Sequence, residues 1–330
     1  EVFSRIDAIR ETYGPGVGVQ VTGGDPTLRD RRELVAIVRR LADRGLRPAL
    51  FTNGILATRE LLAELAAVGL FDVAFHVDTT QGRAGARSEA DLNSLRDEYV
   101  GRARGLGIAV IFNTTVHDGN LHEVPDLARY FLDRSGVVGM ASFQVHALTG
   151  RGTLGRREAV TMEGVRGRIE EGVGARGLAW DGALIGHPCC HQAAMLVTAG
   201  RSVFDVLHDR PLFARFLEDF RHLSFDRRDV RATAREVVRI AFSDPYYVVR
   251  GGAFLLKGMW ALRAGLLSTR GKTGKITFFI QNFQDADALD LERVANCAFM
   301  VMTGAGPVSM CAHNARRDEF LRALPSYPAA

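Results

Sequence analysis

The sequence has 330 residues, of which 47% are hydrophobic, and this length suits one large domain or two modest ones with ample core. Its net charge is +4, but no basic stretch is interleaved with aromatic residues, so a nucleic-acid surface is not expected. No window approaches about 18 consecutive apolar residues, which excludes a transmembrane helix, and no signal peptide is visible. We therefore expect a cytoplasmic protein, although targeting stays open because the first residue is Glu rather than Met.

The first 145 residues alternate between helix and strand patterns. A helix is predicted over residues 1–14. The predicted strands lie at 17–21, 48–54, 72–78, 108–116 and 137–145, and the helices between them lie at 31–45, 58–69, 89–107 and 120–136. This alternation predicts a parallel sheet or a (β/α) barrel, in which ligands bind at the carboxyl ends of the strands.

Polar side chains stand at the ends of four predicted strands. They are Asn53, Asp78, Asn113 and Gln144. Any one of these residues alone is common in an ordinary loop. Four of them at equivalent positions favour a shared cavity at one edge of the sheet.

The first predicted strand ends in the turn "TGGDP". Gly23 and Gly24 leave the backbone bare, so that its N–H and C=O groups can bond a ligand directly. Asp25 adds a carboxylate suited to an ammonium group, and Pro26 fixes the turn. The turn is neither a dinucleotide fingerprint nor a phosphate loop. The alternative is a tight connection without a ligand.

The regular alternation of helix and strand patterns ends after residue 150, and an approximate domain boundary is predicted there. Helices are expected at 165–174, 202–225 and 228–242, followed by a strand from 274 and a hairpin turning at 304–306. Trp180, Trp260 and the phenylalanines of 203–225 are expected in the core.

The four cysteines form two separated pairs. Cys189 and Cys190 stand in "HPCCH", whereas Cys297 and Cys311 flank the predicted hairpin. Such a set predicts a four-ligand iron–sulfur or zinc site, with nearby histidines in reserve. The alternative is that these cysteines are small buried hydrophobes.

The "GGDPT" turn followed one βα unit later by "FTNG" resembles the radical S-adenosylmethionine (radical SAM) superfamily, over roughly residues 1–150. The resemblance implies an α/β fold, a partial (β/α)₆ TIM-like barrel without its first strand, followed by a smaller α+β domain over 151–330 that contains the cysteines. It implies that S-adenosylmethionine binds at the GGDP turn and the strand ends. The residues implied are Gly23, Gly24, Asp25, Pro26, Thr52, Asn53, Asp78, Asn113 and Gln144.

The resemblance also implies a reaction. Members of this superfamily form a 5′-deoxyadenosyl radical with a 4Fe-4S cluster held by a Cys-x₃-Cys-x₂-Cys loop, and a flavodoxin or ferredoxin supplies the electron. No such loop occurs in these 330 residues. Because the sequence opens on a helix, we expect a truncated chain whose cluster loop lies upstream; the alternative is a relative without the cluster.

The C-terminal block "FFIQNFQDADALDLERVANCAFMVMTGAGPVSMCAHN" resembles more loosely a radical SAM branch of pterin methylases and archaeal tetraether-lipid synthases. That branch also carries extra cysteines after the barrel, in keeping with an auxiliary cluster at Cys189, Cys190, Cys297 and Cys311, but the resemblance carries over no substrate. We expect a small-molecule or lipid substrate, and methyl or alkyl transfer to an unactivated carbon. The rival interpretations are a non-catalytic metal-binding barrel or maturation module, and a zinc hydrolase.

Overall fold

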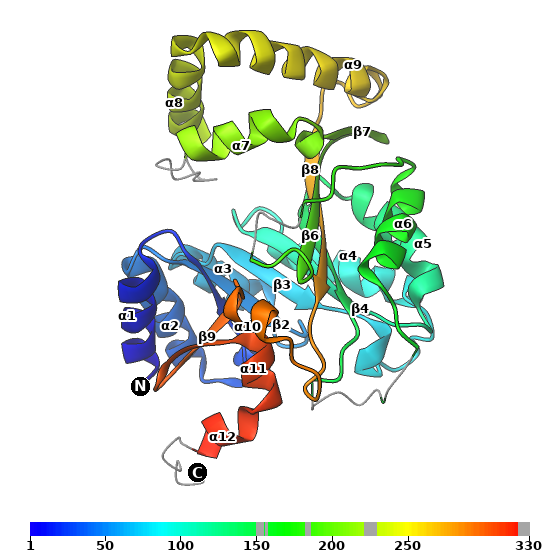
Figure 1. Cartoon of the computed structure of the whole chain (residues 1–330). Coiled ribbons are helices and arrows are strands. Elements are labelled where there is room, and N and C mark those ends of the chain that lie inside the picture. The colour runs from blue at the N-terminus through cyan, green and yellow to red at the C-terminus, as the bar shows by residue number, and fades with distance from the viewer. Residues whose placement is uncertain (150–154, 156–157, 182–185, 221–229, 323–330) are drawn as a thin grey trace.

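A computed structural model describes residues 1–149, 155, 158–181, 186–220 and 230–322 (Figure 1). Its N-terminal part alternates helices and strands as predicted. The elements are α1 (Val2–Tyr13), β1 (Gly18–Val21), α2 (Arg31–Asp43), β2 (Arg47–Thr52), α3 (Arg59–Ala67), β3 (Asp72–His76), α4 (Asn93–Ala103), β4 (Ala109–Val116), α5 (Val124–Leu132) and β5 (Val138–Val145).

Local side chains set where these helices begin. The carboxylate of Asp30 accepts hydrogen bonds from the backbone N–H groups of Arg32 and Glu33, and the Thr58 hydroxyl accepts one from Leu61. Such caps satisfy N–H groups that have no partner inside the helix. The buried stripe of α2, which includes Leu34, then packs the helix against the sheet.

The C-terminal part adds three strands to the same sheet. Helix α6 (Met162–Val173) comes first, and the three strands are β6 (His191–Ala199), β7 (Ser202–Asp205) and β8 (Gly274–Asn282). The strand order is β1-β2-β3-β4-β5-β8-β6-β7, with β1 to β5 and β8 parallel and β6 and β7 antiparallel. The fold is therefore a mixed α/β fold with a mainly parallel, open sheet.

Residues 202–205 correct one prediction. They were expected to begin a helix, but they form β7, which pairs with the end of β6 from Ala199↔Ser202 to Leu196↔Asp205. The "TAGRS" connection folds back as a hairpin at Gly200 (φ 54°). Helix α7 (Arg210–Asp219) starts only after this strand.

One continuous hydrophobic core runs along the sheet. Aromatic rings follow one another from strand to strand, with centroids 5.8 Å apart for Phe75 and Phe112, and 6.4 Å apart for Phe143 and Phe278. The same core takes in Val165 and Ile169 of α6. Both sheet and core thus extend past the predicted boundary at 150, which itself lies outside the described residues, and the division into two domains stays a prediction.

A helical arm projects from the end of the sheet at β6 and β7. It consists of α7, α8 (Val230–Ser243), the π-helical turn η6 (Tyr247–Gly251) and α9 (Gly252–Ser268) (Figure 1). Of the two tryptophans expected in the core, Trp180 is 6% exposed, but Trp260 on α9 is 69% exposed. The prediction for Trp260 is wrong because its side of the helix packs against nothing in the described part of the chain. None of the described helices is long and apolar enough to span a membrane.

The segment after β8 forms a small two-stranded hairpin with helices on either side, and we call this segment the C-terminal hairpin. Helix α10 (Leu291–Ala295) precedes the paired strands β9 (Met300–Thr303) and β10 (Gly306–Ser309), and α11 (Met310–Ala315) and α12 (Arg317–Arg322) follow them. The pairing of β9 with β10 confirms the predicted strand–turn–strand. The ring of Phe299 lies 4.9 Å from that of His191, so the segment before the hairpin contacts β6.

Candidate functional site

The carboxyl ends of the parallel strands surround a cavity of about 370 Å³. We call it the strand-end cavity. Its lining residues come from β1 to β5, β8 and the C-terminal hairpin: Gln20, Thr22, Gly24, Asp25, Phe51, Thr52, Asn53, Ala74, His76, Gln81, Asn113, Gln144, Gln281, Phe283, Phe299 and Met310. Six of the nine residues expected to bind a cofactor are among them, whereas Gly23, Pro26 and Asp78 are not.

The GGDP turn has a conformation that requires its glycines. Gly23 and Gly24 have φ values of 108° and 83°, in the region where a Cβ is strained. No neighbouring atom would block a Cβ at either position. The glycines are therefore needed for the shape of the backbone, and at Gly24 this backbone faces the cavity.

Asp25 joins two neighbouring strand ends. Its carboxylate accepts hydrogen bonds from the Thr27 backbone and hydroxyl (3.0 and 2.6 Å), the Thr52 hydroxyl (2.9 Å) and the Asn53 backbone (2.8 Å). Burial raises the pKa of Asp25, but these bonds outweigh it and hold the pKa below its usual value. The carboxylate is therefore charged at neutral pH and fixes the loop after β1 to the end of β2.

Packing against a neighbouring ring explains why the "FTNG" turn has glycine at position 54. Gly54 has φ 84°, and a Cβ there would lie 2.1 Å from the Tyr99 ring. The backbone N–H of Gly54 donates to the Thr52 hydroxyl (3.1 Å). The Asn53 side chain accepts from the N–H of Ile55 (2.9 Å), so it also shapes the turn while lining the cavity.

Asp78 lies beneath the cavity instead of lining it. Its side chain is fully buried and accepts from the backbone N–H groups of Thr80 (3.0 Å) and Thr115 (2.7 Å). It also accepts from the Thr80 hydroxyl (2.6 Å) and contacts His76 Nε2 (2.7 Å), and the His76 ring lines the cavity. Burial raises the pKa of Asp78, but the bond and charge of His76 and the bonds from Thr80 and Thr115 lower it to about 2. Asp78 is thus a positioning residue that orients His76.

Amide side chains also line the cavity. Asn113 and Gln281 are each 5% exposed, and Gln144 lies beside Gln281 because β5 pairs with β8 in register. Gln20, Asn53 and Gln81 add three further amides to the lining. We did not predict Gln20, Gln281, Phe299 or Met310. The "FFIQN" strand end has the same pattern as the four that we used, so Gln281 could have been found from it.

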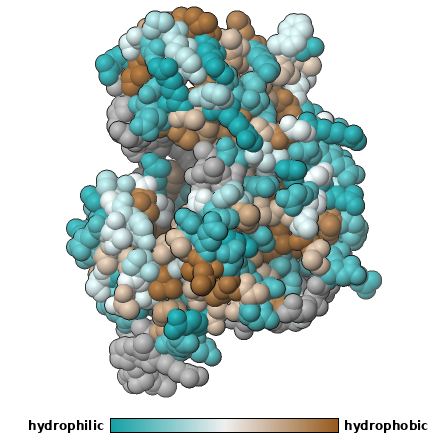
Figure 2. Space-filling view, viewed as in Figure 1, coloured by the Kyte–Doolittle hydropathy of each residue, from teal (hydrophilic) through white to brown (hydrophobic). Residues whose placement is uncertain are grey.

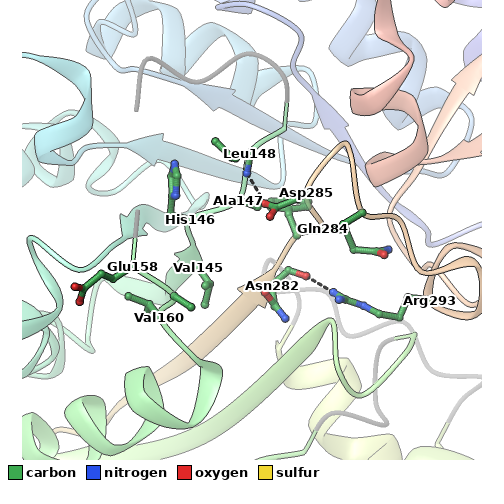
Figure 3. Close-up of a pocket in the computed structure, with 13 residues that line it drawn as sticks. Val145, His146, Ala147, Leu148, Glu158, Val160, Asn282, Gln284, Asp285 and Arg293 are labelled. Carbon is green, nitrogen blue, oxygen red and sulfur yellow. Dashed lines mark hydrogen bonds between the residues drawn. The ribbon is translucent and has the colours of Figure 1, made fainter. Parts of the chain in front are cut away.

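A second cavity of about 340 Å³ adjoins the first and shares Phe283 with it. It lies between the loops after β5 and β8. The Leu148 N–H donates to Asp285 Oδ1 (2.6 Å), and Arg293 Nη2 donates to the Asn282 carbonyl (2.7 Å). Figure 3 shows both bonds, with Glu158 and Arg293 on opposite sides of the cavity. This cavity therefore offers charged groups of both signs.

The four cysteines are all free thiols. Cys190 and Cys311 are buried, whereas Cys189 is exposed, and Cys297 donates to the Phe299 carbonyl (3.1 Å). Burial raises the pKa of Cys311, and the neighbouring Cys297 and Cys190 raise it further, so these three thiols share one region. Even so, no group of three or more Cys, His, Asp or Glu side chains among the described residues is arranged to hold a metal ion. The geometry as it stands does not fit a bound cluster.

Comparisons with known proteins agree with the N-terminal architecture. Residues 1–131 match the family model described as the radical SAM superfamily. The chain is 33% identical over 117 residues to a PqqA peptide cyclase of Bradyrhizobium diazoefficiens, covering 35% of this chain and 30% of the relative. It is 31% identical over 144 residues to a PqqA peptide cyclase of Methylorubrum extorquens, covering 42% of this chain and 35% of the relative. The chain thus spans about a third of the length of these curated relatives.

Among solved structures, the chain is similar to Streptococcus suis SuiB, with a TM-score of 0.39 and 12% identity over 51% of this chain and 38% of that one. A likeness this weak supports no argument. The family match covers residues 1–131, so this N-terminal part is similar to radical SAM superfamily domains, and the relatives that it matches are named as peptide cyclases, which are enzymes. The roles of single residues in its site stay predictions.

Proposed function

We propose that this chain belongs to a radical SAM enzyme and binds S-adenosylmethionine in the strand-end cavity. The observation that carries the proposal is the convergence of Gly24, Asp25 and Asn53 with the amides of Asn113 and Gln144 on one cavity, in a chain whose first 131 residues match the radical SAM family model. When bound and reduced, S-adenosylmethionine supplies a 5′-deoxyadenosyl radical that abstracts hydrogen from a substrate.

The cavity fits this cofactor in size and in chemistry. Its volume of about 370 Å³ lies in the range of sites that enclose a small organic ligand. The charged Asp25 and the bare backbone at Gly24 suit an ammonium group, and the six amides of the lining supply donors and acceptors for a heterocyclic base or a ribose. Phe51, Phe283 and Phe299 supply apolar walls.

The cysteines of this chain do not provide the catalytic cluster. The four thiols lack the Cys-x₃-Cys-x₂-Cys spacing and are not arranged around a metal ion in the described residues. Under this proposal the catalytic 4Fe-4S cluster is held by residues outside these 330, and a flavodoxin or ferredoxin supplies its electron. An auxiliary iron–sulfur or zinc site at the C-terminal cysteines is a proposal from the sequence spacing, because the described thiols are not arranged around a metal ion.

The second cavity is the proposed place of the substrate. It adjoins the strand-end cavity at Phe283, so a substrate atom there would be close to the cofactor. The relatives are named for cyclising a peptide, PqqA, but they match over about a third of their length. We retain methyl or alkyl transfer to an unactivated carbon of a small molecule or lipid as the proposed outcome; the looser resemblance of the C-terminal block to pterin methylases and tetraether-lipid synthases carries over no substrate.

Calorimetric titration of the chain with S-adenosylmethionine tests the proposal. Gln144→Ala should weaken binding at least about fivefold, because the amide lines the cavity and its loss costs about one hydrogen bond. His146→Ala, which alters only the second cavity, is the matched control and should bind normally. Absence of binding to the wild-type chain, or equal binding by the Gln144 variant, would count against the assigned site.

The alternative function is a non-catalytic metal-binding barrel or maturation module. The observation in its favour is the missing Cys-x₃-Cys-x₂-Cys spacing in these residues. Metal and sulfide analysis of the anaerobically purified intact protein separates the two. Four or more irons with visible absorption and release of 5′-deoxyadenosine support the enzyme, whereas a colourless protein that contains only zinc supports the module.

A further inference from the structure

Helix α9 is apolar on two opposite sides, and only one of them is covered by described residues. The buried side consists of Gly258, Leu262 and Gly265, which pack against β6 and β7. A Cβ on Gly265 would lie 1.8 Å from the Ala199 carbonyl oxygen, and one on Gly258 would lie 3.1 Å from the Phe204 ring. These glycines bring the helix close to the sheet and fix which side faces outward.

The outward side carries a stripe that we call the outer stripe: Leu256, Trp260, Arg263 and Leu267. Their spacing of 4, 3 and 4 residues keeps all four on one helical face, opposite the buried side. Leu256, Trp260 and Leu267 are 64, 69 and 83% exposed. Side chains this large and apolar are rarely left in water as a group unless they contact a partner or a membrane.

The outer stripe continues into the rest of the arm. Other large apolar side chains of α8, η6 and α9 are also exposed: Val238, Phe242, Val248, Val249, Leu255 and Met259. Figure 2 shows hydrophobic side chains gathered along the top of the arm, where α9 lies in Figure 1. The other exposed large apolar residues of the described chain are Leu217 on α7 and residues scattered over α1, α10 and single turns.

The charges from η6 through α9 to β8 are of one sign, whereas the acidic residues of the arm, such as Glu218 and Asp219 on α7, come earlier in the chain. Residues 245–284 contain six Lys or Arg and no Asp or Glu, and they include all three lysines of the sequence. Arg250 is paired with Asp209 (2.7 Å). In the described part of the chain, by contrast, Lys257, Arg263, Arg270 and Lys272 are exposed, and no ion pair is seen for any of them. The Arg263 guanidinium lies 4.0 Å from the Trp260 ring centroid.

We infer that the arm docks on the surface of an anionic lipid membrane, with the outer stripe in the interface and the basic residues against the headgroups. Leu and Trp on one face with Lys and Arg beside them are typical of helices that lie in the membrane interface. A second copy of this chain fits less well, because two cationic faces would repel each other. The lipid surface supplies both an apolar layer and the opposite charge.

Docking in this way leaves the strand-end cavity open. Helix α9 ends where β8 begins, and Gln281 lines the cavity at the other end of that strand. About seven residues of strand separate them, which is about 25 Å. The inference is therefore independent of the proposed function, and membrane binding should leave the affinity for S-adenosylmethionine unchanged.

Sedimentation with vesicles tests the inference. The chain should bind vesicles of phosphatidylcholine with a quarter phosphatidylglycerol, and should bind phosphatidylcholine alone at least about tenfold more weakly. Trp260 serves as a reporter, because the only other tryptophan, Trp180, is buried and bonded to Glu170. Its fluorescence should shift to shorter wavelength with the anionic vesicles.

Two variants of the arm probe the two halves of the interaction. Leu256→Ser with Leu267→Ser should lower binding at least about tenfold and abolish the fluorescence shift. Lys257→Glu with Lys272→Glu should lower binding by a similar factor and make the remainder insensitive to salt. Leu291→Ser, at a site 77% exposed but outside the arm, is the matched control and should bind normally. Circular dichroism confirms that each variant is folded.

Three results would overturn the inference. The first is that the wild type fails to bind anionic vesicles. The second is equal binding by the arm variants and the wild type, which would place the contact elsewhere. The third is a stable dimer in solution that the double serine variant dissociates, which would assign the outer stripe to a second copy of the chain.

Discussion

The Thr52 hydroxyl lies 2.9 Å from both carboxylate oxygens of Asp25, and this contact ties the end of β2 to the loop after β1. Thr52 is 4% exposed, and its oxygen also accepts from the Gly54 N–H. One side chain therefore joins the GGDP turn to the "FTNG" turn. The two sequence motifs act as one structural unit.

Removing the Thr52 hydroxyl should test this unit. Thr52→Val keeps the shape of the side chain but leaves one donor fewer for Asp25 and no acceptor for Gly54, and it should lower the free energy of unfolding by about 1–3 kcal/mol. Urea denaturation measures the change. Thr52→Ser retains the hydroxyl and should lose less than half as much; equal losses would mean that the methyl group matters more than the bonds.

The two kinds of glycine in the site should respond differently to alanine. Gly24→Ala meets only backbone strain and should cost about 1–2 kcal/mol of unfolding free energy. Gly54→Ala meets the same strain and a collision with the Tyr99 ring, so it should cost at least about 3 kcal/mol. Thermal and urea unfolding give both values. The reverse order would contradict the packing described for Gly54.

Asp78 should make the stability of the fold depend on acid. Its pKa is about 2 in the folded chain, below the ordinary value of 3.8, so the folded state favours the charged form. The resulting stabilisation, about 2 kcal/mol, is present above about pH 4 and is lost as the pH falls through about 2.

The variant Asp78→Asn isolates this contribution. It should be less stable than the wild type by about 2 kcal/mol at pH 7, and the difference should shrink between about pH 4 and pH 2. Urea unfolding at pH 7, 4 and 2.5 follows it. If the difference in unfolding free energy between the variant and the wild type stayed constant over this pH range, the charge of the Asp78 carboxylate would not be the source of the stabilisation.

The thiols should differ in reactivity when no metal is bound. Cys189 is exposed and should be alkylated by iodoacetamide first. Cys311 is 8% exposed, and burial raises its pKa, so it has less of the reactive thiolate and should react at least about tenfold more slowly. Peptide mass spectrometry over time gives the two rates, and protein unfolded in urea is the control in which all four should react. Equal rates in the folded chain would contradict the burial of Cys311.

Much of the N-terminal architecture could be predicted because its signals are local. Alternating helix and strand patterns predicted five strands and the helices between them, and the structure confirms each. The polar residues after those strands also converge, since parallel strands bring their carboxyl ends to one edge. Asp78 follows the same pattern but turns inward, because its bonds to Thr80 and Thr115 hold it beneath His76.

Contacts distant in sequence could not be predicted in this way. Strand β8 pairs with β5 across more than a hundred intervening residues, and only this pairing places Gln281 beside Gln144. The exposure of Trp260 depends on which side of α9 packs against the sheet, and Gly258 and Gly265 decide that through their close approach to β6 and β7. The sequence shows which side chains are apolar and which share a helix face. Whether other residues cover that face is decided by the three-dimensional packing of the chain.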